Sequence, residues 1–138
     1  MPGYSGTPLP KKLGIKDGFR VQFVQAPSEV LGELRAALAA CEAVRDARTP
    51  LDFAMLFTGS KTELTKEFKP IARQLAPAGM LWVSWPKKSS GVATDLDENV
   101  VRTIGLAAGL VDVKVCAVTE VWSGLKFVRR VKDRDKGA

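Results

Sequence analysis

The residues best suited to chemistry form a basic, hydroxyl-rich loop that precedes a predicted helix. Ammonium groups, hydroxyls and the N–H groups of a helix start all attract anions. The loop lacks the Gly-x-x-x-x-Gly-Lys-Ser/Thr spacing of a phosphate-binding P-loop. We predict that it binds a small anionic ligand; the alternative is a solvated loop with a capping threonine. The expected ligand-binding residues are Lys87, Lys88, Ser89, Ser90, Thr94, Asp95 and, from the N-terminal arm, Tyr4.

A second group of charged residues links a predicted helix to a predicted strand. Asp95 and Arg102 are seven residues apart on the helix, and Asp112 and Lys114 are two apart on the strand. Each pair therefore shares one face of its element. We predict a structural network of Arg102, Asp112 and Lys114. A catalytic role for Asp112 or Lys114 would need one of them to lie in a cleft with a shifted pKa.

The cysteines and the missing histidine restrict the possible mechanisms. The chain contains no histidine, which excludes imidazole bases and His-containing zinc sites. Cys41 and Cys116 are too few for a zinc cluster. Cys116 shares a strand face with Lys114, a cation that would stabilise a thiolate, but a buried core thiol is the preferred interpretation. We assign no metal site and no catalytic residue.

The net charge is concentrated at the C-terminus. The 138 residues include 21 Lys plus Arg and 15 Asp plus Glu, a net charge of +6. Residues 126–138 hold six bases and two acids, so the rest of the chain carries only +2. Such tails are more often solvated ends than nucleic-acid arms. We expect no nucleic-acid partner; binding of nucleic acid through the basic tail is the alternative.

Periodicity predicts strands that alternate with helices. We expect strands over residues 19–25, 51–58, 80–85, 113–119 and 125–131, and helices over 28–40, 60–75 and 94–105. This order predicts a single Rossmann-like three-layer α/β domain with a mostly parallel sheet and a C-terminal antiparallel strand pair. Residues 1–18 would form an N-terminal arm, 19–131 the α/β domain and 132–138 a charged, frayed tail. We expect Pro70 to kink or split its helix, and Gly105 to end the following one.

The apolar segments indicate a protein without a membrane span. No run reaches the roughly 18 apolar residues that a span needs, and the N-terminus shows no signal peptide. We expect a cytoplasmic protein with no membrane partner. The terminal strand pair at a sheet edge is a natural place for a homodimer contact.

Strings along nearly the whole chain resemble one bacterial family. They are YSGTPL (residues 4–9), KKLGI (11–15), WPKK (85–88), TDL (94–96), VDVKVCAV (111–118) and WSGLKF (122–127). In these strings the chain resembles the uncharacterised StaR-like family, domain of unknown function 3052. The family's association with regulation of an antibiotic-type biosynthetic pathway implies a regulatory role.

The architecture also resembles the class I methyltransferase fold. The shared features are the alternating order, a Pro-Ala-Gly turn at 77–79 before a buried strand, the Ala-Gly-Leu entry at 108–110 and the terminal strand pair. The resemblance implies that S-adenosylmethionine binds at a glycine-rich turn after the first strand. It also implies that an acidic residue after the second strand binds the ribose of this cofactor. Here residues 25–28 read Gln-Ala-Pro-Ser, and Asp46 is the candidate acid.

The missing histidine and the missing glycine-rich turn together decide our preferred interpretation. We expect no cofactor and a non-enzymatic small-ligand binding or regulatory domain, because a shared fold does not carry function. The alternative is an enzyme on a methyltransferase-like fold that acts on a small substrate. Its proton-handling group would be Asp112, Lys114 or Tyr4.

Overall fold

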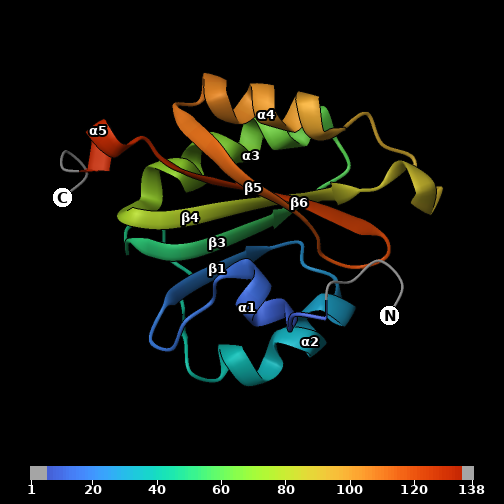
Figure 1. Cartoon of the computed structure of the whole chain (residues 1–138). Helices are drawn as coiled ribbons and strands as arrows, with labels where there is room; N and C mark the ends of the chain where they lie inside the picture. The colour runs from blue at the N-terminus through green and yellow to red at the C-terminus, as the bar shows by residue number, and fades with distance from the viewer. Residues whose placement is uncertain (1–5, 135–138) are drawn as a thin grey trace.

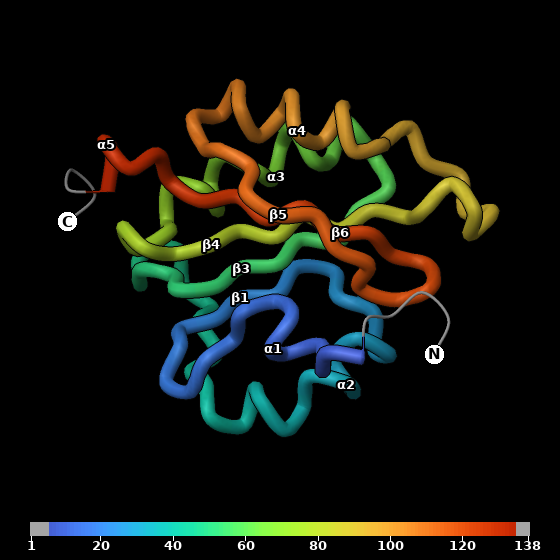
Figure 2. Tube along the Cα trace, viewed as in Figure 1, coloured from blue at the N-terminus to red at the C-terminus, as the bar shows by residue number. Residues whose placement is uncertain are grey.

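The computed structural model describes residues 6–134 of the chain. Figure 2 traces the path of the chain through these elements. In chain order they are α1 (Leu9–Leu13), β1 (Arg20–Val24), α2 (Ser28–Leu38), β2 (Glu42–Ala43), β3 (Leu51–Phe57), α3 (Lys61–Gln74), β4 (Leu75–Pro86), the short 3-10 helix η1 (Lys88–Ser90), α4 (Glu98–Ala107), β5 (Leu110–Ala117), β6 (Trp122–Arg129) and α5 (Val131–Arg134).

The strands form one sheet in the order β2-β1-β3-β4-β6-β5. β2, β1, β3 and β4 run parallel, whereas β6 is antiparallel to both of its neighbours, β4 and β5. Figure 1 shows α1 and α2 on one face of the sheet and α3 and α4 on the other. The predicted fold class, a Rossmann-like α/β domain with a mostly parallel sheet and a C-terminal antiparallel pair, is confirmed.

Strand β3 explains why helices cover both faces. Every residue of β3 except Asp52 is buried. Because side chains alternate along a strand, Phe53 and Met55 join the core under α1 and α2, whereas Ala54 and Leu56 join the core under α3 and α4. A parallel strand that is apolar on both faces needs a packed layer on each side.

The N-terminal arm is anchored to the sheet through α1. Leu9 and Leu13 are buried among the side chains of α2 and β3. The indole N–H of Trp82, in β4, donates a 2.9 Å hydrogen bond to the carbonyl oxygen of Leu13. This bond satisfies the only polar atom of a fully buried tryptophan. It also fixes the C-terminal end of α1 over the face of β4.

Two prolines behave differently from our expectation. α3 continues from Lys61 to Gln74 with Pro70 inside it, so the helix is not split at this proline. Pro70 lies on the exposed side of α3, where the buried stripe around Phe68 and Ile71 holds both halves against the sheet. The expected turn at 77–79 lies within β4, at a register shift in its pairing with β3.

The start of α4 also corrects the sequence interpretation. We expected Thr94 to cap this helix, but the helix begins at Glu98 because the Asp97 carboxylate accepts the N–H of Val100 at 2.9 Å. Thr94 instead accepts the N–H of Leu96 in a tight turn. Gly105, the expected stop, lies inside α4.

The helices of the described chain are short. The longest, α3, has 14 residues, and no helix within residues 6–134 is long and apolar enough to cross a membrane. The four residues Val131–Arg134 form α5, which includes the first three residues of the segment 132–138 that we expected to be a frayed tail. Residues 135–138 lie outside the described residues.

Gly105 yields the first testable prediction. A Cβ atom at this position would lie 2.0 Å from the ring of Phe127, which also packs edge-on against Phe68 with 5.2 Å between the ring centroids. We expect Gly105→Ala to lower the free energy of unfolding by about 1–3 kcal/mol through overpacking. Urea denaturation followed by circular dichroism measures this change.

The matched control is Gly32→Ala in the exposed part of α2. No atom lies within 4 Å of a Cβ at that position. The added methyl group should raise the free energy of unfolding by up to about 1 kcal/mol, because alanine favours helix over glycine. Equal changes in the free energy of unfolding for the two substitutions would contradict the conclusion that Gly105 leaves the space for the ring of Phe127.

Candidate functional site

The order of the strands creates a crevice at the carboxyl end of β1. From β1 the chain crosses to β2 on one side and returns to β3 on the other side. Because α2 and α3 cover opposite faces of the sheet, the loops after β1 and β3 diverge here. Ligands of open α/β sheets bind at such switch points. The loops that follow the parallel strands β1, β2, β3 and β4 all begin at this edge of the sheet.

A side-chain bridge links the end of β1 to the first turn of α3, the helix that follows β3. Gln25, directly after β1, donates from its amide Nε2 to Glu63 Oε1 at 2.8 Å. Gln25 has a left-handed backbone with φ of +57°, a conformation that is uncommon outside glycine. Hydrogen bonds from Thr58 and Gln25 lower the pKa of the Glu63 carboxyl, so Glu63 is ionised at neutral pH.

Glu63 is a site residue that the sequence did not reveal as one. Its position three residues after Ser60 indicated only a capping box, and Ser60 Oγ does accept the N–H of Glu63 at 3.2 Å. The side chain of Glu63 faces the end of β1 rather than the N–H of Ser60. The only signal for this role was the position of Glu63 in the first turn of the helix that follows β3.

The loop after β4 is fastened to the start of α3. Thr94 donates its hydroxyl to the carbonyl oxygen of Gly59 at 2.7 Å, and the Asp95 carboxylate accepts the N–H of Lys61 at 2.8 Å. Asp95 thereby places its own negative charge at the N-terminus of α3, where a bound anion would otherwise be favoured. Thr94 and Asp95 hold two loops together in this structure.

The remaining expected ligand residues lie in and around η1. Lys87 donates its N–H to Val121, in the β5–β6 loop, and the hydroxyl of Ser90 donates to the Lys87 carbonyl oxygen at 2.6 Å. Lys88 and Ser89 are exposed. Tyr4 lies outside the described residues. The binding of an anion by this loop stays a prediction.

A cavity of about 560 Å³ opens beside the bridge, between α3 and the loop after β2. This volume lies within the range of small-molecule sites. Its apolar lining includes Val24, Val44 and Ile71, and its polar lining includes Gln22 and Asp46. The cavity therefore lies at the carboxyl ends of β1 and β2.

Asp46, the acid that follows β2, lines this cavity in a fixed orientation. Its carboxylate accepts the N–H groups of Arg48 and Thr49 and the Thr49 hydroxyl, at 2.6–2.8 Å. These hydrogen bonds lower the pKa of Asp46. Gln74 of α3 donates to the carbonyl oxygens of Asp46 and Thr49 and so fixes the loop. Asp46 is a preorganised, ionised acceptor.

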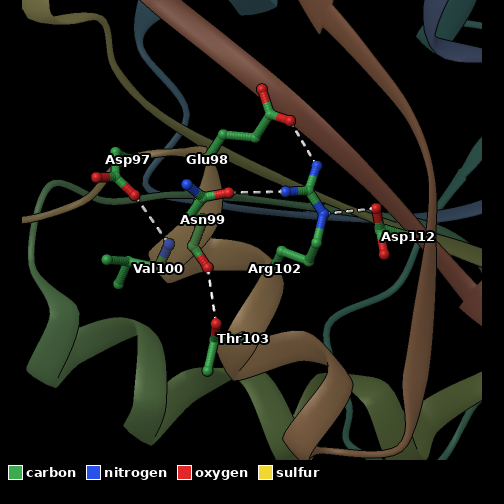
Figure 3. Close-up of polar contacts among 7 residues, drawn as sticks. All are labelled: Asp97, Glu98, Asn99, Val100, Arg102, Thr103 and Asp112. Atoms are coloured by element: carbon green, nitrogen blue, oxygen red, sulfur yellow. Dashed lines mark hydrogen bonds and ion pairs between the residues drawn. The ribbon is translucent and has the colours of Figure 1, made fainter.

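The network on α4 contains Arg102 and Asp112 but not Lys114. Arg102 Nε donates to Asp112 Oδ2 at 2.8 Å, and its other guanidinium nitrogens bind Asn99 and Glu98 (Figure 3). The guanidinium lowers the pKa of the Asp112 carboxyl.

The position of Lys114 corrects the proposed network. A register shift between Asp112 and Lys114 inserts an extra residue, Val113, into β5. Because one extra residue reverses the alternation of side chains, Lys114 points to the face of α1, where its Nζ donates to the Lys12 carbonyl oxygen at 3.2 Å.

Comparison with known proteins gives a result for the fold alone. The sequence matches no family model and no curated protein. Magnesium protoporphyrin IX methyltransferase from Synechocystis, with bound SAH, is similar with a TM-score of 0.59 at 13% identity, over 83% of this chain and 75% of that one. Precorrin-6y C5,15-methyltransferase from Geobacter metallireducens has a TM-score of 0.57 at 11% identity, over 88% and 86%. The chain has the class I methyltransferase fold.

A SAM-dependent methyltransferase from Aquifex aeolicus is similar to the same degree, with a TM-score of 0.56 at 15% identity over 85% of both chains. These three similar structures are all described as methyltransferases, and this finding corrects our preference for a non-enzymatic binding or regulatory domain in favour of the alternative, an enzyme on this fold.

The Arg102–Asp112 pair yields a prediction for the pH dependence of stability. A carboxyl whose pKa is depressed on folding stabilises the protein above its unfolded pKa, near pH 4, and loses this contribution as the pH falls through its folded pKa. Asp112→Asn should therefore lower the melting temperature at pH 7, and its difference from wild type should shrink as the pH falls below 4. Thermal melts between pH 2.5 and 7 measure this difference.

The control is Glu120→Gln in the exposed β5–β6 loop, which should follow the wild-type curve at every pH. A difference between Asp112→Asn and wild type that stays constant down to pH 2.5 would show that the ion pair does not supply the effect.

Proposed function

We propose that this protein is an enzyme on the class I methyltransferase fold that acts on a small substrate. The cofactor implied by the fold is S-adenosylmethionine, which supplies a methyl group when bound. The observation that supports the proposal is the cavity at the carboxyl ends of β1 and β2, with the ionised Asp46 in its wall. We assign the nucleoside part of the cofactor to this cavity.

The residues of the cavity suit a nucleoside. Asp46 accepts three hydrogen bonds from its own loop, and a carboxylate has about four lone-pair positions. We propose that this carboxylate also accepts a hydrogen bond from a ribose hydroxyl. Val24, Val44 and Ile71 supply apolar walls for a flat base.

The loop after β1, where this fold binds the amino-acid part of the cofactor, differs from the glycine-rich turn that the fold implies. Ala26 and Pro27 stand where a glycine-rich turn would let the backbone approach closely. No side chain caps the first turn of α2. The N–H groups of Ser28 and Glu29 are therefore the donors that could bind the carboxylate of the cofactor. We therefore expect weaker binding of the amino-acid part than a glycine-rich turn provides.

The substrate would lie at the carboxyl end of β3, next to Glu63. The ionised carboxylate of Glu63 accepts hydrogen bonds and would orient a hydroxyl or amine of the substrate. Asp112, one of the three proton-handling candidates, is held in the ion pair on α4, and Lys114 faces α1. Tyr4 remains a candidate outside the described residues.

The StaR-like resemblance refines this proposal. It rests on strings that include the loops at 85–88 and 94–96 and the strands at 111–118 and 122–127. The association that this resemblance implies is with a biosynthetic pathway, although no family model matches the sequence. We infer a small metabolite as its substrate, and a homodimer contact at the β5 edge stays a prediction.

Titration calorimetry with S-adenosylhomocysteine tests the proposal. We expect wild type to bind it, and Asp46→Asn to weaken the binding about tenfold, since a good charge-assisted hydrogen bond contributes about 1.5 kcal/mol. Ala47→Trp should abolish binding, because Ala47 is exposed in the cavity wall and a large side chain there fills the cavity without disturbing the core.

Glu33→Gln provides the control. It removes a carboxylate from the exposed surface of α2, on the other face of the sheet, and should bind like wild type. Absence of heat with wild type at millimolar ligand, or unchanged binding by Ala47→Trp, would overturn the assignment of the cavity.

A further inference from the structure

A second cavity lies on the opposite face of the sheet from the cavity that contains Asp46. It has a volume of about 510 Å³ and lies between α1 and the C-terminal half of β5. Its lining is unusually basic, and none of the mechanism proposed above uses it. The residues that matter here are Lys11, Lys12, Lys114 and Cys116.

The sheet places two lysines directly opposite each other beside this cavity. Lys114 of β5 pairs with Lys126 of β6 across the antiparallel ladder. Like charges at directly opposed positions destabilise a sheet. Burial lowers the pKa of Lys126, and the nearby charges of Lys114 and Lys16 lower it further. The two strands therefore hold a concentration of positive charge that an anion would relieve.

Hydrogen bonds fix two of these ammonium groups in the wall of the cavity. Lys12 Nζ donates to the carbonyl oxygen of Ala117 at 3.0 Å, and Lys114 Nζ donates to the carbonyl oxygen of Lys12 at 3.2 Å. These reciprocal bonds tie α1 to β5. An ammonium group has three N–H donors, so the bond to Lys12 uses one of the three donors of Lys114.

The charges of this region also act on Cys116. Burial raises the pKa of the Cys116 thiol, whereas Lys12, Lys114 and Lys87 oppose this rise. Lys87 directly follows β4. Because its charge lowers the pKa of Cys116, this cavity lies near the loop that follows β4. Cys116 is a free thiol in the cavity wall and can report on what occupies it.

From this geometry we infer that the cavity between α1 and β5 binds the phosphate group of a small molecule. Several lysines that converge on one cavity match an ion with multiple charges and several acceptor oxygens, and lysine is a common phosphate ligand. The cavity has the size of a small-molecule site. The positively charged lysines line a single cavity, whereas the basic residues of a nucleic-acid site extend along the protein surface. The inference stands apart from the cofactor cavity, which lies on the other face.

The test uses the full chain and inorganic pyrophosphate as the probe, at an ionic strength kept constant with sodium chloride. Wild type should bind pyrophosphate in titration calorimetry, and its melting temperature should rise. Lys114→Gln, which removes an ammonium group from the cavity lining, should weaken the binding at least tenfold. Lys126→Gln should melt at a higher temperature than wild type without the probe, because it removes the repulsion within the Lys114–Lys126 pair.

Lys132→Gln, in α5 and exposed, is the matched control and should bind like wild type. In a Cys41→Ala background, pyrophosphate should slow the alkylation of Cys116 by iodoacetamide at least fivefold. Absence of pyrophosphate binding, or equal binding by Lys114→Gln, overturns the inference. Tighter binding of duplex DNA that the same lysine substitutions abolish also overturns it, in favour of a nucleic-acid surface. Binding of S-adenosylhomocysteine by these variants reports separately on the proposed function.

Discussion

The two-sided burial of β3 is the constraint on which the rest of the structure depends. Apart from Asp52, its residues are buried against one core or the other, so each face of the sheet must carry a layer of helices. A chain that covers both faces must change direction within the sheet, and it does so between β1 and β3. That change opens the crevice where the bridge between Gln25 and Glu63, the cavity and Asp46 lie. The packing of apolar residues thus determines the place of the site before any polar residue is considered.

Much of this fold could be predicted from local patterns, because the strands and helices carry their own periodicity. The apolar runs of β3 and β4 and the stripe of α3 are signals within one element. The features that escaped prediction depend on contacts between distant residues. Gly105 lies inside α4 because the ring of Phe127, 22 positions along the chain, occupies the space of a side chain. The inserted Val113 reverses the direction of Lys114, and nothing in the alternation of β5 marks it.

The candidate site was only partly visible in the sequence for the same reason. Asp46 could be found because an acid after the second strand has a known place in this fold, and it does line the cavity. Glu63 carried only the signal of a helix cap. The basic cavity was hidden because Lys11 and Lys12 are far from Lys114 in the chain, and they line one cavity only when α1 packs on β5. The net charge of the chain therefore understated a local concentration of positive charge.

The central claim is that the cavity beside Asp46 holds the nucleoside of an S-adenosyl cofactor, although the loop after β1 has no glycine. A crystal structure of the protein grown with S-adenosylhomocysteine tests this most directly. The claim predicts electron density for adenosine between Val44 and Ile71, with a ribose hydroxyl within hydrogen-bond distance of the Asp46 carboxylate. Density for the cofactor elsewhere on the protein, or a cavity that holds only water at saturating cofactor, would contradict it.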